Sequence, residues 1–485
     1  MTGRWAVGLL LLAACALQSA SPSARLPALW GPEDRVVISD FSQIDAVAAS
    51  PWLVFAATPH GLLIYDRMTR RFRPPVTSLD GFPPGRARRA MADPSGNAVW
   101  LDLGNGLDYF RYDVDGRAWT RGPLPSGQVV ATLSVEAALA SAPLADAMRA
   151  AILTDSRLRS HQFTSAAGTL ERPEIFFGTN GMGLVRVDKQ TGEWEVLSYG
   201  LIAPGVGAVA LAPDGIWAAA NARPGGGGRG GGQRRGLTWV ATDLSATRTT
   251  EGGGAALGFT FLYSRRLLTA ANQLWLATEQ GVLRIDPATF RSRLFDLPNA
   301  TSLARAPDGV WVGTTRGLSV ITQDDRIVPM SPSGLPITSL LAVRETLWVG
   351  TTAGLGQLVP GAETITTPPE LTDRPGLRVP VYALARLQDT IVMATERELL
   401  WRNPISHEWS GIPLPLNLGI PTALAADPNG GLWIGGTLGL AQAEIARPSI
   451  RVHPVPFEIP GAVRDVTADG DFLWVATDSG LVRIR

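Results

Sequence analysis

The chain has 485 residues, of which 45% are hydrophobic and 18% charged, so it is long and apolar enough to bury a large core. Lysine plus arginine equals aspartate plus glutamate at 43 each, and this balance gives no support to nucleic acid, an anionic surface or an acidic substrate as a partner. Glycine (53) and proline (37) are abundant, which favours many short strands joined by turns over long helices. A single cysteine excludes an intramolecular disulfide, a thiolate zinc site and an iron–sulfur cluster.

The first residues have the pattern of a targeting segment. Arg4 precedes an apolar stretch, residues 6–14, that is too short to span a bilayer, and this stretch ends in Leu12-Ala13-Ala14-Cys15. The four residues resemble a bacterial lipobox, which implies cleavage before Cys15, acylation of Cys15 and a lipid anchor in the cell envelope. The alternative is an ordinary signal peptide cut after Ala16. Because Ala16 rather than an aspartate follows the cysteine, the resemblance favours the outer membrane, on an undetermined side.

We therefore divide the chain into a signal peptide (1–14), a flexible tether (15–32) that is rich in Ser, Pro and Ala, and one large repetitive domain (33–485).

One phrase, Trp-x-Gly/Ala-Thr/Gly-x-x-Gly-Leu/Val, recurs through that domain. Five copies are nearly identical and begin at Trp275, Trp311, Trp348, Trp433 and Trp474. Five weaker copies centre on Phe55 with Gly61, Trp100 with Gly106, Phe176 with Gly183, Trp217 with Gly236, and Val392 with Glu398 in place of the glycine. Neighbouring tryptophans lie 36, 37 or 41 residues apart, close to the period of a four-stranded propeller blade.

The residues of each copy explain this expectation. The tryptophan segment is apolar on both faces, as expected for a strand packed between two neighbouring sheets. A tight Thr-x-x-Gly hairpin and another strand follow it, and a small apolar strand with an Asp/Pro/Gly turn precedes it. The last copy ends at Arg485 after its third strand, so we expect residues 35–38 to supply the missing outer strand and to close the ring.

The repeat resembles the two-component regulator propeller repeat of bacterial periplasmic sensors. The resemblance implies an all-β propeller of four-stranded blades that binds saccharides or partner subunits. Since no spanning helix, kinase, receiver or DNA-binding segment follows Arg485, we expect no signalling through this chain itself. Ten copies exceed the usual four to eight blades, so one large ring, one smaller ring with degenerate extra repeats, or two rings are open, and the terminal strand favours one ring.

Two segments interrupt the repeats. Residues 134–160 have helical character, with Ser134 as a candidate N-cap, and we expect either packing on the rim or a docking or lid function. Residues 224–236 form a Gly-rich, arginine-containing loop without the spacing or lysine of a phosphate loop. We expect flexible filler there, with contact to acidic lipid headgroups as the alternative.

No catalytic, metal-ligating or cofactor-binding constellation emerges, and we predict neither a metal nor a cofactor. The four histidines, His60, His161, His407 and His453, have no partner at metal-ligand spacing and are predicted to be surface or turn residues. Arg284, Arg316 and Arg483 follow the repeat glycines and could form a ring on one face.

Three functions fit these features. The first is an envelope-anchored propeller that binds or scaffolds a protein partner or a glycan. The second is an envelope enzyme that acts on polysaccharide as a lyase or hydrolase. The third is an accessory protein that passes its ligand state to a separate sensor.

Overall fold

The computed structural model describes residues 30, 34–104, 109–124, 129–140, 142–221, 235–250, 261, 263–307, 309–331, 334–360, 362–372 and 375–485. Cys15, the signal peptide and nearly all of the tether lie outside this set, as do Gly106 and residues 222–234 of the Gly-rich loop. The described part of the chain folds into ten antiparallel sheets, eight of four strands, one of five and one of three. The predicted all-β propeller class is confirmed.

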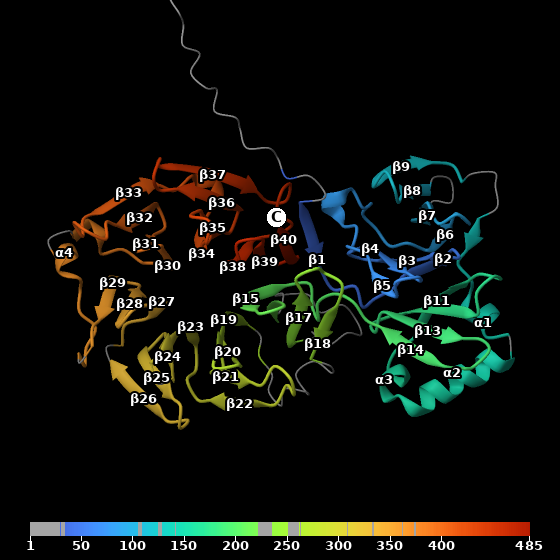
Figure 1. The fold of residues 1–485 in the computed structure, drawn as a ribbon, viewed down its shortest axis with the longest axis horizontal. Helices are drawn as coiled ribbons and strands as arrows, with labels where there is room; N and C mark the ends of the chain where they lie inside the picture. Colours follow the sequence, from blue (N-terminus) through green and yellow to red (C-terminus); the bar gives the residue numbers. More distant parts are fainter. Residues whose placement is uncertain are drawn as a thin grey trace, which may run out of the picture.

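Seven sheets form a ring (Figure 1), because their innermost strands contact one another in an unbroken circle from β15 through β38 and back to β15. We call this the seven-sheet ring. Its sheets are β15 (Val206–Ala212), β16 (Gly215–Ala220), β17 (Leu237–Ala241) and β18 (Thr247–Thr249); β19 (Ser264–Ala270), β20 (Gln273–Thr278), β21 (Val282–Ile285) and β22 (Ser292–Phe295); β23 (Ala300–Ala306), β24 (Gly309–Thr314), β25 (Gly317–Thr322) and β26 (Ile327–Ser331); β27 (Ile337–Val343), β28 (Thr346–Thr351) and β29 (Gly354–Leu358); β30 (Ala383–Leu387), β31 (Thr390–Ala394), β32 (Glu398–Arg402) and β33 (Trp409–Pro413); β34 (Pro421–Ala426), β35 (Leu432–Gly436), β36 (Gly439–Glu444) and β37 (Ser449–Pro454); and β38 (Val463–Ala468), β39 (Leu473–Thr477) and β40 (Gly480–Ile484) with β1 (Arg35–Ile38).

The other three sheets lie beside the ring (Figure 1), and we call them the three-sheet group. They are β2 (Ala46–Ala49), β3 (Leu53–Thr58), β4 (Gly61–Asp66) and β5 (Arg71–Phe72); β6 (Arg89–Ala92), β7 (Ala98–Asp102), β8 (Tyr109–Asp113) and β9 (Ala118–Gly122) with β10 (Val130–Ala131); and β11 (Phe163–Gly168), β12 (Glu174–Thr179), β13 (Leu184–Asp188) and β14 (Trp194–Leu197). Strand β2 packs against both β6 and β11.

The predicted closure by the N-terminal strand is confirmed. Strand β1 pairs antiparallel with β40 as the outermost strand of the last sheet. At the ring's inner edge, the buried carboxylate of Asp465 on β38 accepts hydrogen bonds from the backbone N–H of Val209 on β15 (3.1 Å) and from Arg266 on β19 (2.7 Å). The Asp465 carboxylate therefore joins the closing sheet to the next two sheets around the ring.

The single ring does not contain all ten repeats, and this corrects the sequence-based expectation. After β1 the chain leaves the ring, builds the first three repeats, and returns at β15. The innermost strands β38 and β15 then meet directly, so the circle is complete with seven sheets and no gap admits the other three. Seven lies within the usual range for a propeller.

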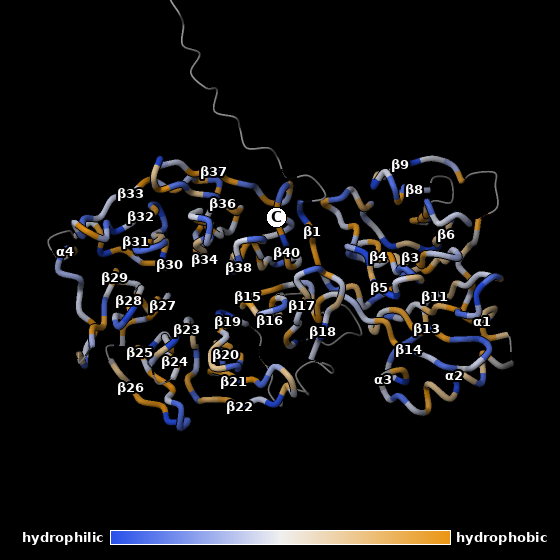
Figure 2. Tube along the Cα trace, viewed as in Figure 1, coloured by the Kyte–Doolittle hydropathy of each residue, from blue (hydrophilic) through white to orange (hydrophobic). Residues whose placement is uncertain are grey.

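A continuous core connects the two parts. Phe41 and Ile44 on the outgoing segment and Tyr199 and Leu201 on the returning one are buried together with residues of both parts. A bridge between Asp40 and Gly200 holds these two segments side by side, and one between Gln43 and Asn180 joins the outgoing segment to the turn between β12 and β13. Hydrophobic stretches follow the strands of both parts, and hydrophilic stretches gather at the turns between them (Figure 2).

The repeated threonine stabilises the hairpin turn in most of the described sheets. In six of the sheets its hydroxyl donates to the carbonyl of the glycine three or four residues later, as between Thr314 and Gly317 (3.1 Å) and between Thr477 and Gly480 (2.7 Å). The same bond occurs from Thr58, Thr179, Thr278 and Thr351. At Val392's repeat the bond is kept with Glu398 as acceptor (3.1 Å from Thr395), which explains why this copy tolerates the loss of glycine.

The predicted helical insertion is confirmed. It contains α1 (Val135–Ala138), α2 (Ala142–Thr154) and α3 (Ser156–Arg159), and the Ser134 hydroxyl accepts a hydrogen bond from the N–H of Ala137 (3.1 Å) as an N-cap. Leu144, Met148 and Leu158 are buried with the sheet of β11–β14, so the insertion packs on the rim. The ring contains short helical turns as well, α4 (Pro369–Thr372), η2 (Pro375–Leu377) and η3 (Leu416–Leu418), and η1 (Ser78–Asp80) lies in the three-sheet group. Within the described residues, no helix is both long and apolar enough to cross a membrane.

Candidate functional site

A cavity of about 390 Å³ opens between the sheet of β23–β26 and the three-stranded sheet of β27–β29. Its apolar wall contains an indole, a thioether and two leucine side chains, from Trp311, Met330, Leu347 and Leu358. Exposed charged side chains line it as well, namely Arg305, Arg344 and Glu345. A concave apolar surface with a few polar groups is the usual form of a small-ligand site.

In the part of the chain that the structure describes, the second of these sheets has no fourth strand. After β29 the chain turns, with the N–H of Ala362 donating to Val359 (3.1 Å), and only Thr366 pairs back onto Gln357. The two neighbouring sheets each have a fourth, outer strand. Prolines at 360, 368, 369, 375 and 380 account for this break, because proline cannot donate to a sheet ladder.

Trp311 differs from its counterparts in the other well-defined repeats. Trp275, Trp348, Trp433 and Trp474 are buried, with at most 9% of each residue exposed. Trp311 occupies the same strand position but is only half-buried, and it lines the cavity. The tryptophan that is buried in the other copies is thus only partly buried here.

The charged side chains of the cavity are held loosely. Arg305 donates to the carbonyl of Thr269 (2.7 Å), and Arg344 lies 3.8 Å from Asp389 with 80% of its side chain exposed. Such exposed pairs are weak and exchange readily with other partners. The cavity therefore offers hydrogen-bond donors and an acceptor to a ligand at small cost. The sequence alone does not reveal the cavity, because Trp311 stands at the repeat position where tryptophan is expected in the core.

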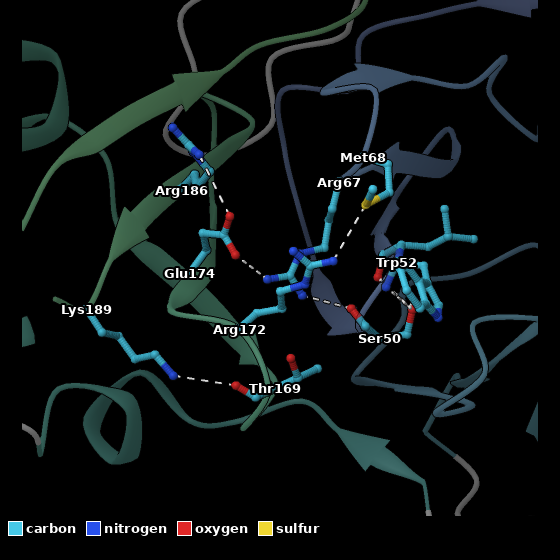
Figure 3. A network of polar contacts seen from close by, with 10 residues as sticks. Ser50, Trp52, Arg67, Met68, Thr169, Arg172, Glu174, Arg186 and Lys189 are labelled. Atoms are coloured by element: carbon cyan, nitrogen blue, oxygen red, sulfur yellow. Dashed lines mark hydrogen bonds and ion pairs between the residues drawn. The ribbon is translucent and has the colours of Figure 1, made fainter. Parts of the chain in front are cut away.

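A second polar cluster connects two sheets of the three-sheet group (Figure 3). Arg67, with 2% of its side chain exposed, donates to Glu174 at 2.5 Å and to the carbonyl of Ser50 at 2.8 Å. Arg186 lies 4.0 Å from Glu174 on the far side of that carboxylate. Burial acts to raise the pKa of Glu174, but the hydrogen bond and charge of Arg67 outweigh it and the pKa is lowered. Because these charges compensate each other, we assign the cluster a structural function.

The surface beside this cluster carries Trp52, which is 49% exposed. The guanidinium of Arg172 lies over its ring at 5.7 Å and points a nitrogen toward the sulfur of Met68 (Figure 3). This pair is a cation–π contact at an exposed site.

The residues singled out from the sequence do not form a common site. His60 and His407 are exposed and His161 is intermediate, as predicted for surface or turn residues, but His453 is buried and the prediction for it is wrong. Its Nδ1 lies 2.5 Å from Glu458, and the ring of Trp30 stacks on it with centroids 4.0 Å apart. Sequence spacing could not show this, because both neighbours come from loops. Among the described residues, no group of three or more His, Cys, Asp or Glu side chains is arranged to hold a metal ion.

The arginines after the repeat glycines do not converge on one face either. Arg284 pairs with Asp325 of the next sheet around the ring, and Arg483 donates to the carbonyl of Thr242 in the next sheet at 2.6 Å. Arg316 lies apart, on an exposed hairpin turn. Two of the three thus join neighbouring sheets.

No protein-family profile matches this sequence, and no curated protein is significantly similar to it. Solved structures resemble its fold. One is PorZ, a surface component of the type IX secretion system of Porphyromonas gingivalis, at 10% identity and a TM-score of 0.54, over 93% of this chain and 87% of that one. Another is the extracellular domain of a putative one-component system from B. thetaiotaomicron (14% identity, TM-score 0.38, 91% and 75% covered). A third is virginiamycin B lyase from Staphylococcus aureus (14% identity, TM-score 0.45, 58% and 94% covered). At these identities the likeness to PorZ concerns the fold alone, and it supports a propeller architecture for this chain.

Proposed function

We propose that this protein is a binding module of the cell envelope, anchored by lipid at Cys15, that recognises a saccharide in the Trp311 cavity. The observation that carries the proposal is the half-buried indole of Trp311 beside Arg305, Arg344 and Glu345. An indole face packs well against the C–H faces of a sugar ring, and guanidinium and carboxylate groups hydrogen-bond its hydroxyls. The resemblance of the repeats to those of bacterial sensor propellers supports the same ligand class.

Binding to a glycan array tests the cavity. The wild-type protein is compared with Trp311→Ala and with Trp52→Ala, which removes an exposed tryptophan far from the cavity. We expect Trp311→Ala to raise the Kd for the retained glycan by about tenfold, which corresponds to a loss of about 1.4 kcal/mol of binding free energy. Trp52→Ala should leave the Kd unchanged. Equal retention by Trp311→Ala and the wild type, with both proteins folded, would place the ligand elsewhere.

The anchor is tested separately. Cells fed a labelled fatty acid should incorporate it into the wild-type protein and not into Cys15→Ala. Crosslinking of the anchored protein in its own membrane, with Cys15→Ala beside it, then asks whether an envelope protein is the partner instead. If the wild type captures a partner protein and binds nothing on the glycan array, the proposed ligand is a protein and not a saccharide.

A further inference from the structure

Four large hydrophobic side chains lie exposed on the loops at one end of the sheet of β34–β37, namely the loop before β34, the β35–β36 turn and the loop after β37. They are Leu416 (95% exposed), Phe457 (78%), Leu438 (54%) and Ile420 (46%), and we call them the apolar loop patch. Single exposed hydrophobic residues are ordinary, but a group on one face indicates an interaction surface.

Backbone hydrogen bonds hold the three loops of the patch together. The N–H of Leu438 donates to Leu418 (3.0 Å), that of Thr437 donates to Ile420 (3.1 Å), and that of Val455 donates to Leu438 (3.0 Å). The hairpin turn that carries Leu438 is thus fixed between the loop of η3 and the loop that carries Phe457. These hydrogen bonds fix the backbone of the loops, so the exposed side chains are held away from the protein core.

The described chain begins at the same sheet. The ring of Trp30 stacks on His453 of β37 and lies 6.1 Å from the ring of Trp433 on β35. His453 pairs with Leu440 on β36, two residues from Leu438 in the patch. The first described residue therefore reaches the fold beside the apolar loop patch.

The length of the preceding chain limits where a lipid at Cys15 can be. Fourteen residues, 16–29, separate Cys15 from Trp30. At most about 3.3–3.6 Å is gained per extended residue, so a bilayer that holds Cys15 lies within about 50 Å of Trp30. The sheet that holds Trp30 is therefore the part of the ring nearest to the anchor along the chain.

We propose that the apolar loop patch inserts into the surface of the lipid bilayer and fixes the orientation of the ring on the membrane. The inference rests on the proposed anchoring of Cys15. A lipid anchor alone leaves the ring free to rotate, whereas Phe457, Leu416 and Leu438 add a second contact of the kind by which peripheral proteins bury apolar side chains at the headgroup boundary. The Trp311 cavity, in a sheet on another part of the ring, would then keep a constant direction relative to the membrane.

The test uses the single cysteine of the chain. In the lipidated protein the lipid blocks the sulfur of Cys15, so Phe457→Cys introduces one free thiol for an environment-sensitive fluorophore. The control is Ile405→Cys, a residue 90% exposed on a turn of the neighbouring sheet and outside the patch. Both labelled proteins are reconstituted into phosphatidylcholine vesicles with and without brominated acyl chains. Because insertion of about 5–10 Å brings the probe to the acyl boundary, brominated lipid should reduce emission at position 457 by about half and leave position 405 nearly unchanged.

Each outcome separates the two proposals. Equal, aqueous emission at 457 and 405 in the anchored protein overturns the inference, and leaves a protein partner as the occupant of the patch. Uptake of the probe by the wild-type protein, or its failure to incorporate the labelled fatty acid, overturns the anchor instead. In that case the same two variants are made with Cys15→Ser and mixed with the vesicles, and quenching at 457 supports insertion by the patch alone while its absence overturns it.

Discussion

Val37 on β1 lies directly opposite Val482 on β40, so the first described strand of the chain completes the sheet that holds its last strands. Both side chains are buried, 4% and 0% exposed, and both belong to the core between the last two sheets of the ring. The ring is thus closed by pairing between the two ends of the chain, without a covalent bond. Closure of this kind removes the exposed sheet edges that an open propeller would leave.

This arrangement predicts a large effect of a small change in β1. Ile38 is fully buried, and Ile38→Ala should lower the free energy of unfolding by about 2–5 kcal/mol, because it removes buried methylene groups and leaves a cavity. Ile327→Ala, at an outer-strand position that is 38% exposed, should change it by about 0.5 kcal/mol or less. Urea unfolding of the two variants measures both values. A wild-type midpoint for Ile38→Ala would mean that β1 adds little to closure.

The order of strands within each repeat and the closing strand were predictable, because both depend on short local sequence patterns. The tryptophan strand and the Thr-x-x-Gly hairpin can each be recognised from a few consecutive residues. The last copy ends at Arg485 after its third strand, which indicates that an outer strand must come from elsewhere in the chain. The Ser134 cap was predictable for the same reason. These features can be predicted from the residue patterns of single strands, turns and helix caps.

The division into seven and three sheets was not predictable from the repeats. All ten copies have similar apolar faces, so their sequences do not determine which sheet packs against which. The division is set by the connecting segments, where Phe41 and Tyr199 pack together with ring centroids 6.4 Å apart. The cavity was not predictable for a related reason, since the burial of Trp311 depends on how its sheet packs against the next one.

The hairpin glycines provide a second prediction. Gly281 has φ +151°, and a Cβ built there would lie 2.3 Å from the carbonyl oxygen of Phe295. Gly281→Ala should therefore cost about 1–3 kcal/mol through backbone strain and a clash that cannot relax without moving β22. Gly122→Ala, where a Cβ would meet nothing within 4 Å, is the matched control and should be neutral or slightly stabilising. Comparable thermal shifts for the two alanines would contradict the geometry.

The cluster around Arg67 provides a third prediction. Glu174→Gln keeps the shape of the side chain but removes the charge that compensates the buried guanidinium, so it should destabilise the protein by about 1–3 kcal/mol. Asp146→Asn breaks the pair with Arg149, whose side chains are 71% and 72% exposed, and should cost about 0.5 kcal/mol or less. Chemical denaturation in low and high salt distinguishes them, because a buried pair is screened less than an exposed one. A loss at Glu174 that disappears in high salt would argue against burial as the cause.

The buried histidine of the ring predicts a dependence of stability on pH. Burial lowers the pKa of His453, and it outweighs the opposing effects of the hydrogen bond and charge of Glu458. Arg451 and Arg35 act in the same direction as burial. Between this lowered pKa and the ordinary value of about 6.5, the unfolded chain binds more protons than the folded one, so acidification favours unfolding.

Stability should therefore fall as the pH drops below about 6.5, and the fall should end once the pH is below the folded-state pKa of His453. The contribution of one such group cannot exceed about 1.4 kcal/mol per pH unit. His453→Gln removes the imidazole and should flatten this part of the profile, even if the variant is less stable at every pH, whereas His60→Gln, at an exposed turn, should keep the wild-type slope. Urea unfolding at intervals from pH 5 to pH 8 gives the three profiles. Parallel curves for the wild type and His453→Gln would show that the proton on His453 does not distinguish the folded state from the unfolded one.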